Sequence, residues 1–335
     1  MSEAIWWWGF LLSFRDTTRM ARKKKGEAIH GWICFDKPLE MTSTSAVGKI
    51  RWLFQAQKAG HAGTLDPLAT GILPIALGEA TKTVPYLMEA DKVYSFTITF
   101  GRTTDSYDAE GRTIAESDAR PTREAIEAAI PQFIGLIEQV PPAFSAIKVD
   151  GKRAYDLARE GVEVELKARE IEVFDLALDA FDTETASFTL HCGKGTYVRS
   201  IARDLCLELG VCGHVTTLRR EAVGAFDTKD SITLEKLEEL VHRGAHLEAL
   251  LGVETALDDI PGLPVTQDEA ARLKQGRDLA LLPRQIEPLK AALKARLDDG
   301  YHEFPDTVQA VFNGQVLALC ELRGGILHPS RLLNL

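Results

Sequence analysis

A glycine-rich stretch at residues 60–71 holds the side chains of this chain that are best suited to chemistry. It carries the imidazole of His61 and the carboxylate of Asp66 between two expected regular elements. Glycine lets a backbone approach a ligand closely, and Pro67 restricts Asp66 to an extended conformation. We therefore expect Asp66 to be held in a fixed position toward a ligand. An ordinary Asp-Pro turn is the alternative that the same residues allow.

Three further residues could act together with Asp66. Arg199 follows a glycine turn near the start of an expected helix, where a guanidinium could pair with a carboxylate across a cleft and keep it ionised. Tyr94 begins an alternating strand, and Tyr197 lies at the start of the same helix as Arg199. Taken singly, such an arginine is more often a surface charge and such tyrosines pack a core, so only the combination is specific.

Apolar periodicity predicts the elements that must position these residues. The first half of the chain is expected to contain strands at residues 31–35 and 92–102 and helices at residues 45–58 and 121–133. A later strand runs to Cys192, and the helix after it is expected to be capped by Thr196 and to end at Gly210. Strands and helices without a regular βαβ rhythm indicate an α+β fold.

The length of 335 residues predicts two domains rather than one. The Pro-Gly-Leu-Pro segment at residues 261–264 is the expected linker. After it, Thr266 and Glu269 have the spacing of a capping box, and Asn313-Gly314 has the chemistry of a hairpin turn. We expect an N-terminal extension at residues 1–27, disordered or an upstream mis-start, a catalytic domain at residues 28–258 and a small β-containing module at residues 262–335.

Composition narrows the class of protein. Hydrophobic residues make up 45% and charged residues 26%, which is typical of a soluble globular chain. The five cysteines are scattered without the paired spacing of a structural zinc site, so buried thiols and a cytoplasmic location are expected. The apolar run at residues 4–14 is shorter than the roughly 20 residues that span a bilayer, and no membrane association is expected.

Charge is distributed unevenly along the chain. The net charge is −10, yet residues 19–61 carry nine Lys/Arg against three acidic residues. An acidic protein with this distribution can still present a basic face to a polyanion. A solvated charge run near the N-terminus is the alternative explanation.

Five ordered motifs resemble one known family. The segment GHAGTLDPLATGILP at residues 60–74 closely resembles the catalytic loop of the TruB family of tRNA pseudouridine-55 synthases. Four further segments agree in the same order: residues 36–38 with 42–43, 92–94 with 104–108, 141–148 with 153–155, and 195–200 with 218–220. The resemblance covers about residues 28–250 strongly and the C-terminal module weakly. It implies a mixed, mainly antiparallel sheet with flanking helices and a PUA-like C-terminal module.

The same resemblance implies a reaction and three catalytic residues. Asp66 matches the family's essential nucleophile, Arg199 the arginine that pairs with it, and Tyr94 the tyrosine that stacks on the target uracil and is implicated in proton transfer. Uridine 55 in the T-loop of tRNA would be flipped out and isomerised to pseudouridine without cofactor or metal. Whether Asp66 attacks the ribose, attacks the base or removes a ribose proton toward a glycal stays open.

The resemblance also implies substrate contacts. His61 matches the histidine that meets the opened T-loop, and Tyr197 and Leu218 match residues that contact the nucleotide. The expected partner is tRNA through its T-arm, with the acceptor end as a second candidate contact, bound by a monomer without an obligate protein partner. The chain departs from the family at Glu40 and Cys206, where glycine is frequent, so the shape of the turn at Glu40 is open.

Three alternative functions fit parts of the same pattern. One is a related synthase acting on another RNA, such as rRNA, with guiding partner proteins. A second is an RNA-binding or tRNA-folding protein that keeps the scaffold without catalysis. A third is a carboxylate-dependent hydrolase, which would need a second acid near Asp66; Asp105 and Asp108 are the available residues.

Overall fold

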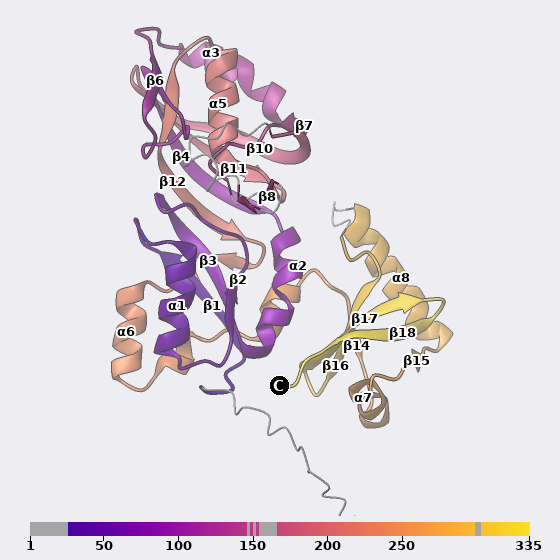
Figure 1. Ribbon diagram of the computed structural model, residues 1–335. Coiled ribbons are helices and arrows are strands. Elements are labelled where there is room, and N and C mark those ends of the chain that lie inside the picture. Colours follow the sequence, from indigo (N-terminus) through magenta and orange to yellow (C-terminus); the bar gives the residue numbers. More distant parts are fainter. Residues whose placement is uncertain (1–25, 146–147, 150–151, 154–165, 299–302) are drawn as a thin grey trace, which may run out of the picture.

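Two β-sheets of different size organise the molecule (Figure 1). The computed structural model describes residues 26–145, 148–149, 152–153, 166–298 and 303–335. The larger sheet has nine strands in the order β1-β3-β12-β4-β11-β10-β7, with β2 paired to β3 and β13 paired to β12. Its strands are β1 (Gly31–Lys37), β2 (Ala59–His61), β3 (Ala69–Leu77), β4 (Lys92–Phe100), β7 (Gly135–Gln139), β10 (Arg169–Phe181), β11 (Thr185–Cys192), β12 (Gly213–Val223) and β13 (Phe226–Asp227).

The larger sheet is mixed and mainly antiparallel. Strands β3 and β12 run parallel, and the neighbouring pairs β1–β3, β12–β4, β4–β11, β11–β10 and β10–β7 run antiparallel. In β4 the predicted alternation is present, since Tyr94, Phe96, Ile98 and Phe100 are buried and the residues between them are half-buried. The α+β prediction with a mainly antiparallel sheet is therefore confirmed.

Short helices and two small ribbons cover this sheet and connect its strands. The helices are α1 (Ser43–Leu53), α2 (Val84–Glu89), α3 (Arg123–Ala129), α5 (Val198–Glu208) and α6 (Leu234–His242), with 3-10 turns η1 (Gly78–Lys82), η2 (Ile130–Phe133), η3 (His246–Ala249) and η4 (Val253–Leu257). The ribbons are β5 (Arg102–Thr104) with β6 (Thr113–Glu116), and β8 (Lys148–Val149) with β9 (Lys152–Arg153). Parts of the motif at residues 141–148 and 153–155 lie outside the described residues.

Helix α1 differs from its prediction at both ends. It begins after Thr42, whose side chain accepts a hydrogen bond from the Ser45 backbone N–H, and it ends at Leu53 rather than at residue 58. The end is set by Gln55, which adopts a left-handed backbone with φ of 48°, a conformation that cannot continue a helix. The apolar periodicity continues past this point because Phe54 is still buried in the core.

The start of helix α5 is a correction to the predicted cap. The N-cap residue is Tyr197, whose side chain makes no capping hydrogen bond. Thr196 instead donates its hydroxyl to the backbone carbonyl of Gly193, 3.2 Å away, within the preceding turn. The predicted cap at Thr196 is therefore wrong, and the first turn of α5 has no capping hydrogen bond from its own N-cap side chain.

The C-terminal part forms a separate five-stranded sheet. Its elements are β14 (Gly262–Pro264), α7 (Gln267–Lys274), β15 (Leu279–Ala280), α8 (Pro283–Asp298), β16 (Thr307–Phe312), β17 (Gln315–Arg323) and β18 (Ile326–Leu332), and the strand order is β14-β16-β17-β18-β15. The capping box at Thr266 and Glu269 is confirmed. Asn313 and Gly314 both have positive φ, as a two-residue turn between β16 and β17 requires. The expected linker is partly wrong, because β14 pairs in parallel with β16.

The two sheets meet through η1, α2 and η4 of the larger part. Lys82 donates its ammonium to the carbonyl of Leu332 at 2.7 Å, and the Arg296 Nε lies 2.7 Å from an oxygen of Asp259. The ring of Tyr86 packs on Phe304 with centroids 4.3 Å apart. Figure 1 shows the smaller sheet beside α2, on one flank of the larger part.

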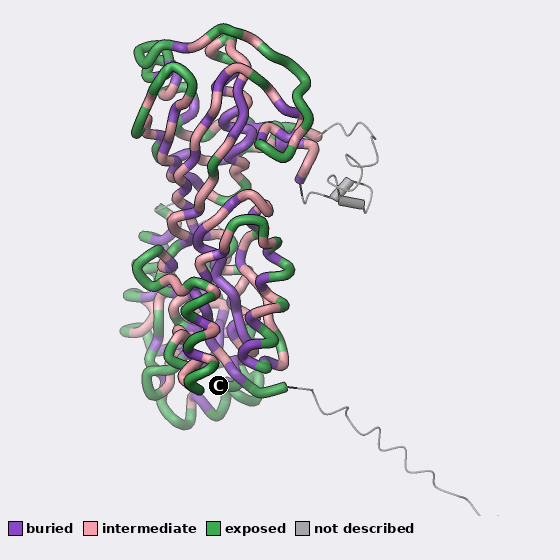
Figure 2. Tube along the Cα trace, turned by 90° about the vertical axis from the view of Figure 1, so that its left-hand side faces the viewer, coloured by how far each residue is buried: buried purple, intermediate pink, exposed green. Residues whose placement is uncertain are grey.

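Burial follows the two sheets (Figure 2). Three clusters of buried apolar residues form the core, and one of them lies entirely within the C-terminal sheet and its helices. Glu27, which the predicted N-terminal extension includes, pairs with Ala56 of the main body. In the described part of the chain no helix is long and apolar enough to span a membrane.

Candidate active site

The loop that carries Asp66 is fixed on both sides of the carboxylate. It connects β2 to β3. Before Asp66, the hydroxyl of Ser43 donates to the carbonyl of Leu65 at 3.0 Å and accepts from its backbone N–H at 2.9 Å. After Asp66, the carbonyl of Pro67 accepts from the backbone N–H of Glu40 at 2.9 Å and from the Lys37 ammonium at 3.3 Å. The position of Asp66 is thus determined by α1 and by the turn after β1.

The turn after β1 keeps the shape that glycine favours. Glu40 has a φ of 63°, so a non-glycine residue occupies the left-handed region. The ammonium of Lys37, which is fully buried, donates to the carbonyls of Pro38 and Met41 within this turn. Burial lowers the pKa of Lys37 to about 8. The departure at Glu40 therefore leaves the turn intact, at the cost of a strained backbone.

Arg199 pairs with Asp66 in the first turn of α5. Its Nη2 lies 2.9 Å from Oδ2 of Asp66, and the arginine side chain is 5% exposed while that of Asp66 is 39% exposed. The same guanidinium donates to the carbonyls of Ser106 at 3.1 Å and Phe144 at 2.8 Å. A bond network of this kind holds the buried cation rigidly against the carboxylate.

A second carboxylate shares the same guanidinium. Oδ2 of Asp108 lies 3.5 Å from Nη1 of Arg199, and its Oδ1 accepts from the Ser106 hydroxyl at 2.5 Å. Tyr107, just before it, has a φ of 60°, a left-handed backbone that L side chains rarely adopt. Sequence reasoning named Asp108 only as the second acid of a hydrolase. In the structure it lies on the other nitrogen of Arg199.

These charges act in opposite directions on Asp66. Burial raises the pKa of the Asp66 carboxyl and outweighs the attraction of Arg199, which lowers it. The negative charge of Asp108 raises it further, and the Lys37 ammonium lowers it. Asp66 is consequently a more basic and more nucleophilic carboxylate than an exposed aspartate, provided that the pH keeps it ionised.

Tyr94 lies on the central strand β4, beside β12. It is buried, and burial raises the pKa of its hydroxyl. Arg220 is its cross-strand partner on β12, and Leu218, two residues earlier on β12, points into the same cavity. Arg220 is fully buried and donates to the carbonyls of Ile72 at 2.7 Å and Gly63 at 3.1 Å, which ties the catalytic loop to the sheet.

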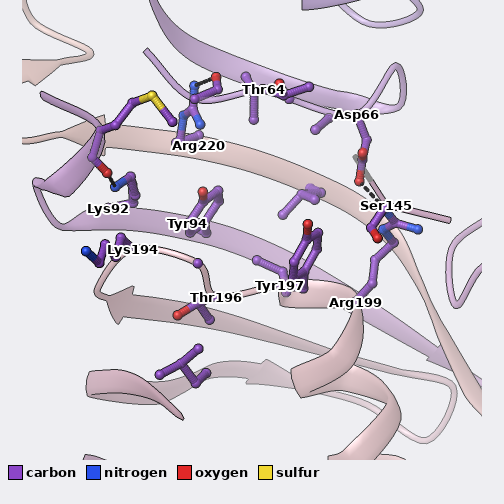
Figure 3. A pocket seen from close by; sticks show the side chains of 18 of the residues that line it. Thr64, Asp66, Lys92, Tyr94, Ser145, Lys194, Thr196, Tyr197, Arg199 and Arg220 are labelled. Atoms are coloured by element: carbon purple, nitrogen blue, oxygen red, sulfur yellow. Dashed lines mark hydrogen bonds and ion pairs between the residues drawn. The ribbon is translucent and has the colours of Figure 1, made fainter. Parts of the chain in front are cut away.

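A cavity of about 490 Å³ brings five of the six predicted site residues together. Its wall includes Asp66, Tyr94, Tyr197, Arg199 and Leu218. Figure 3 shows Asp66 and Arg199 facing each other at one end, with Ser145 beside them, Tyr94 in the middle, and Lys92 and Lys194 at the opposite end. The volume lies within the range of about 300 to 1,000 Å³ that is typical of small-molecule sites.

His61 is not among the residues that line this cavity. It lies on β2, paired with Ile75, and its Nδ1 is buried without a hydrogen-bond partner among the described residues. Burial lowers the pKa of His61. Its predicted contact with the RNA stays a prediction.

The cavity wall carries more cationic than acidic side chains. The cationic residues are Lys92, Arg169, Lys194, Arg199 and Arg220, and the acidic ones are Asp66, Glu89 and Glu170. Among the described residues, no acidic side chain forms an ion pair with Lys92, Arg169 or Arg220. A polyanionic ligand fits such a wall. The part of the chain that the structure describes contains no cluster of three or more potential metal ligands.

The chain matches two family models and is similar to curated proteins over most of its length. Residues 51–198 match the model of the TruB family pseudouridylate synthase N-terminal domain, and residues 199–258 match that of the tRNA pseudouridylate synthase B C-terminal domain. A Caulobacter vibrioides protein named tRNA pseudouridine synthase B is 58% identical over 317 residues, which cover 94% of this chain and 100% of the relative. A Bradyrhizobium diazoefficiens protein of the same name is 48% identical, over 94% of this chain and 91% of the relative.

Solved structures show the same fold at lower sequence identity. The Cbf5-Nop10-Gar1 complex contains a chain with a TM-score of 0.68 and 24% identity, matched over 90% of this chain and 84% of that chain. An H/ACA ribonucleoprotein bound to a substrate RNA containing 2′-deoxyuridine contains another, with a TM-score of 0.67 and 21% identity, over 93% and 91% of the two chains. At these identities the likeness concerns the fold.

Proposed function

Because the chain belongs to the TruB family of pseudouridylate synthases, which are isomerases, we propose that it converts uridine 55 in the T-loop of tRNAs to pseudouridine. The observation that carries the proposal is the pairing of the half-buried Asp66 with the buried Arg199 at the end of the cavity, with Tyr94 on the adjoining wall. The curated relatives that bear the name of a tRNA pseudouridine synthase support tRNA as the substrate.

The proposed reaction rearranges bonds within one nucleotide. The bond from C1′ of the ribose to N1 of uracil breaks, the base turns, and a new bond joins C1′ to C5. The proton leaves C5 and N1 gains one, so that no electrons and no external group are exchanged. Asp66 would act as the nucleophile at the ribose or at the base, or would remove a ribose proton toward a glycal. In each of the three routes the carboxylate must be ionised.

Arg199 is proposed to keep the Asp66 carboxylate ionised and oriented toward the bound nucleotide. A buried carboxylate without a partner would take up a proton, because desolvation disfavours its charged form. The guanidinium 2.9 Å away supplies the compensating charge, and Asp108 holds that guanidinium from its other side. The pair is assembled before the substrate arrives, so the reaction needs little reorganisation of charge.

Base flipping is proposed to bring the uracil to this pair. Extruding a base from a folded loop costs a few kcal/mol. Stacking on an aromatic ring returns about 1 to 3 kcal/mol, so that Tyr94 can offset much of this cost. Tyr197 and Leu218 would contact the nucleotide, and His61 would meet the opened T-loop outside the cavity. The cationic wall favours the phosphates that flank the flipped nucleotide.

The division of labour between the two sheets is part of the proposal. Residues 28–258 would form the catalytic domain and residues 262–335 a PUA-like module that contacts the RNA beyond the T-arm. Every described residue that lines the cavity precedes residue 221, which supports a catalytic role for the larger part. The protein is proposed to act as a monomer without an obligate protein partner.

Tritium release from C5-labelled uridine in an unmodified tRNA transcript tests the proposal. Wild type should release one tritium per tRNA, mapped to position 55, and Asp66→Asn should release none while binding the tRNA within about tenfold of wild type, or roughly 1.4 kcal/mol. Release from rRNA fragments but not from tRNA would favour the guided-synthase alternative. Binding of tRNA by wild type without any release would overturn the proposal in favour of an RNA-folding protein.

Tyr94→Phe separates the two roles suggested for this tyrosine. The substitution keeps the ring for stacking and removes only the hydroxyl. Lost turnover with retained tRNA binding supports proton transfer by the hydroxyl, whereas unchanged turnover restricts Tyr94 to stacking. The raised pKa of Tyr94 means that its hydroxyl is protonated at neutral pH.

A further inference from the structure

The helix that carries Arg199 lacks a cap from its own sequence. Helix α5 begins at Tyr197, whose side chain caps nothing, and the Thr196 hydroxyl is used within the preceding turn. The backbone groups at the start of a helix need partners, usually supplied by a nearby Ser, Thr, Asp or Asn. A residue that supplies such a partner here also helps to place Arg199, two residues after Tyr197.

Gln139 supplies one of these partners from the edge strand β7. Its side chain is 1% exposed. Its Oε1 accepts from the backbone N–H of Tyr197 at 2.9 Å, and its Nε2 donates to the carbonyl of the same residue at 3.2 Å. The side-chain amide of Gln139 therefore bonds both the N–H and the carbonyl of Tyr197, as the backbone of a neighbouring β-strand would. This use requires a donor and an acceptor at once, which the glutamine amide offers without charge at any pH and a glutamate of the same length offers only when it is protonated.

The chain that follows Gln139 continues along the same helix. The carbonyl of Val140 accepts from the Ser200 hydroxyl at 2.9 Å and from Nη2 of Arg203 at 2.9 Å. The carbonyl of Phe144 accepts from Nη2 of Arg199. Residues 139–144 thus form a seat for the first turns of α5, and Gln139 lies at the beginning of this seat.

Arg169 holds the turn before α5 from the neighbouring strand. It is the cross-strand partner of Gln139 on β10, and its Nη2 donates to the carbonyl of Gly195 at 2.5 Å. Its guanidinium lies over the ring of Tyr197, 5.1 Å from the centroid. The turn from Gly195 to Tyr197 is therefore held by side chains from two adjacent strands, Gln139 of β7 and Arg169 of β10.

We propose that Gln139 is a positioning residue for the isomerisation, which sets the Tyr197 ring and the Arg199 guanidinium relative to Asp66 without touching the substrate. This inference rests on the proposed function. According to this proposal, a residue on the edge strand β7 influences the geometry of the Asp66–Arg199 ion pair. Removing the amide would loosen the start of α5, and the Arg199 guanidinium would shift relative to Asp66 although its own bonds to Ser106 and Phe144 remain.

A second buried glutamine provides the matched control. Gln309, in the C-terminal sheet, is 8% exposed and donates its Nε2 to the carbonyls of Leu257 at 2.6 Å and Ile260 at 2.7 Å. Gln139→Met and Gln309→Met therefore remove the same buried amide and the same number of hydrogen bonds. Only the first of these changes lies at the seat of α5.

Single-turnover tritium release compares the two variants with wild type. Gln139→Met should lower the rate about ten- to a hundredfold and leave the Kd for tRNA within about threefold, since a positioning residue acts on the chemical step. Gln309→Met should keep the wild-type rate, whatever it does to thermal stability. In the double variant Gln139→Met with Arg199→Ala, the rate should lie close to that of Arg199→Ala alone, because the main effect of Gln139 on the rate is proposed to act through that guanidinium.

The pKa of Asp66, measured by carboxyl carbon NMR in the free protein, gives a readout that needs no substrate. Arg199 and Lys37 lower this pKa, and Asp108 raises it. If Gln139 holds Arg199 in place, Gln139→Met should raise the pKa of Asp66 and Gln309→Met should leave it unchanged. Gln139→Glu should behave like wild type only while the new carboxyl is protonated, since the neutral acid reproduces the donor and the acceptor.

Two outcomes overturn the inference. One is an unchanged Asp66 pKa in Gln139→Met. The other is an equal loss of rate in Gln139→Met and Gln309→Met, which would reduce Gln139 to a stabilising residue. Failure of the proposed function is distinguishable, because wild type would then release no tritium while the pKa comparison would still decide the role of Gln139.

Discussion

Buried charge distinguishes the two sheets of this molecule. Among the residues that the structure describes, the larger sheet and its loops bury five charged side chains, namely Lys37, Lys92, Asp108, Arg199 and Arg220. In the described part of the C-terminal sheet and its helices, Arg296 is the buried charged residue, and the other buried residues are aliphatic apart from Cys320 and the uncharged polar Thr307 and Gln309. Removing an ion from water costs several kcal/mol even after relaxation, so a fold selected for stability alone would avoid the first arrangement.

This difference in buried charge indicates that the part of the fold around the cavity is less stable than an apolar core would be, because it holds the charged groups that the reaction uses. Around the cavity each buried cation is held by backbone carbonyls, as Arg220 is by Ile72 and Gly63, or by carboxylates, as Arg199 is by Asp66 and Asp108. In the C-terminal sheet the buried Arg296 joins two parts of the chain. Changes at buried charges near the cavity should therefore affect turnover, and the change at Arg296 should affect stability.

Arg199→Ala should give the largest loss of turnover. Removing one partner of a buried pair costs about 3 to 5 kcal/mol, and the lower end applies here because the side chain of Asp66 is 39% exposed. If that cost of about 3 kcal/mol falls on the transition state, the rate falls by about 150-fold. Asp66 would also lose the charge that lowers its pKa, so it would be protonated over a wider range of pH. Single-turnover tritium release at several pH values measures both effects.

An exposed arginine serves as the control for this change. Arg243 lies just after α6 with 62% of its side chain exposed, 3.7 Å from Glu239. Arg243→Ala should leave turnover at the wild-type level. Should Arg199→Ala also keep turnover within about tenfold of wild type, the ion pair has no catalytic role and the comparison between the sheets loses its main support.

Asp108→Asn should have a smaller effect and the opposite pH dependence. Loss of a contact to a charged group, worth about 1.5 to 3 kcal/mol, should slow turnover about ten- to a hundredfold. The negative charge of Asp108 raises the pKa of Asp66, so its removal should lower that pKa. In a plot of rate against pH, the rate rises as Asp66 loses its proton, and this rise should move to lower pH in Asp108→Asn.

The pKa of Asp66 in the wild type should therefore lie between its values in the Arg199→Ala and Asp108→Asn variants. Burial raises the pKa of Asp66 above its ordinary value of 3.8, which places the wild-type rise above that pH. Arg199→Ala should shift the rise to higher pH and Asp108→Asn to lower pH. Shifts in the same direction would show that the charges at Arg199 and Asp108 do not act on Asp66 separately.

Sequence reasoning found the residues that motifs carry and missed those that only the tertiary structure brings close. The position of Asp66 in a glycine-rich loop, the alternation around Tyr94 and the glycine turn before Arg199 are local features, and each was legible in the sequence. The sharing of Arg199 by Asp108 depends on the pairing of β12 with both β4 and the loop that carries Asp108. Periodicity contains no information about such contacts.

The cap of α5 shows the same limit. Thr196 has the right type and position for a cap, yet its hydroxyl binds Gly193, and Gln139 acts from a strand about sixty residues earlier. The five-residue error at the end of α1 has a different origin, since Phe54 continues the apolar pattern beyond the left-handed residue Gln55 that ends the helix. In both cases the residue type or the apolar pattern was read correctly from the sequence, but contacts and backbone conformation in the folded chain decided the helix end.

Arg296→Met should give the smallest change in turnover and a clear loss of stability. Its guanidinium, with 4% of the side chain exposed, binds Asp259 and the carbonyls of Glu303 and Phe304, so its loss removes one of the contacts between the C-terminal part and the segment after η4. The free energy of unfolding should fall by about 3 kcal/mol, the lower end for a buried pair because Asp259 is partly exposed. Urea unfolding measures this loss, and single-turnover release should stay within about twofold of wild type. A tenfold fall in the rate would instead show that the smaller sheet takes part in the chemistry, because Arg296 lines no part of the cavity and could affect Asp66 only through the position of the C-terminal sheet.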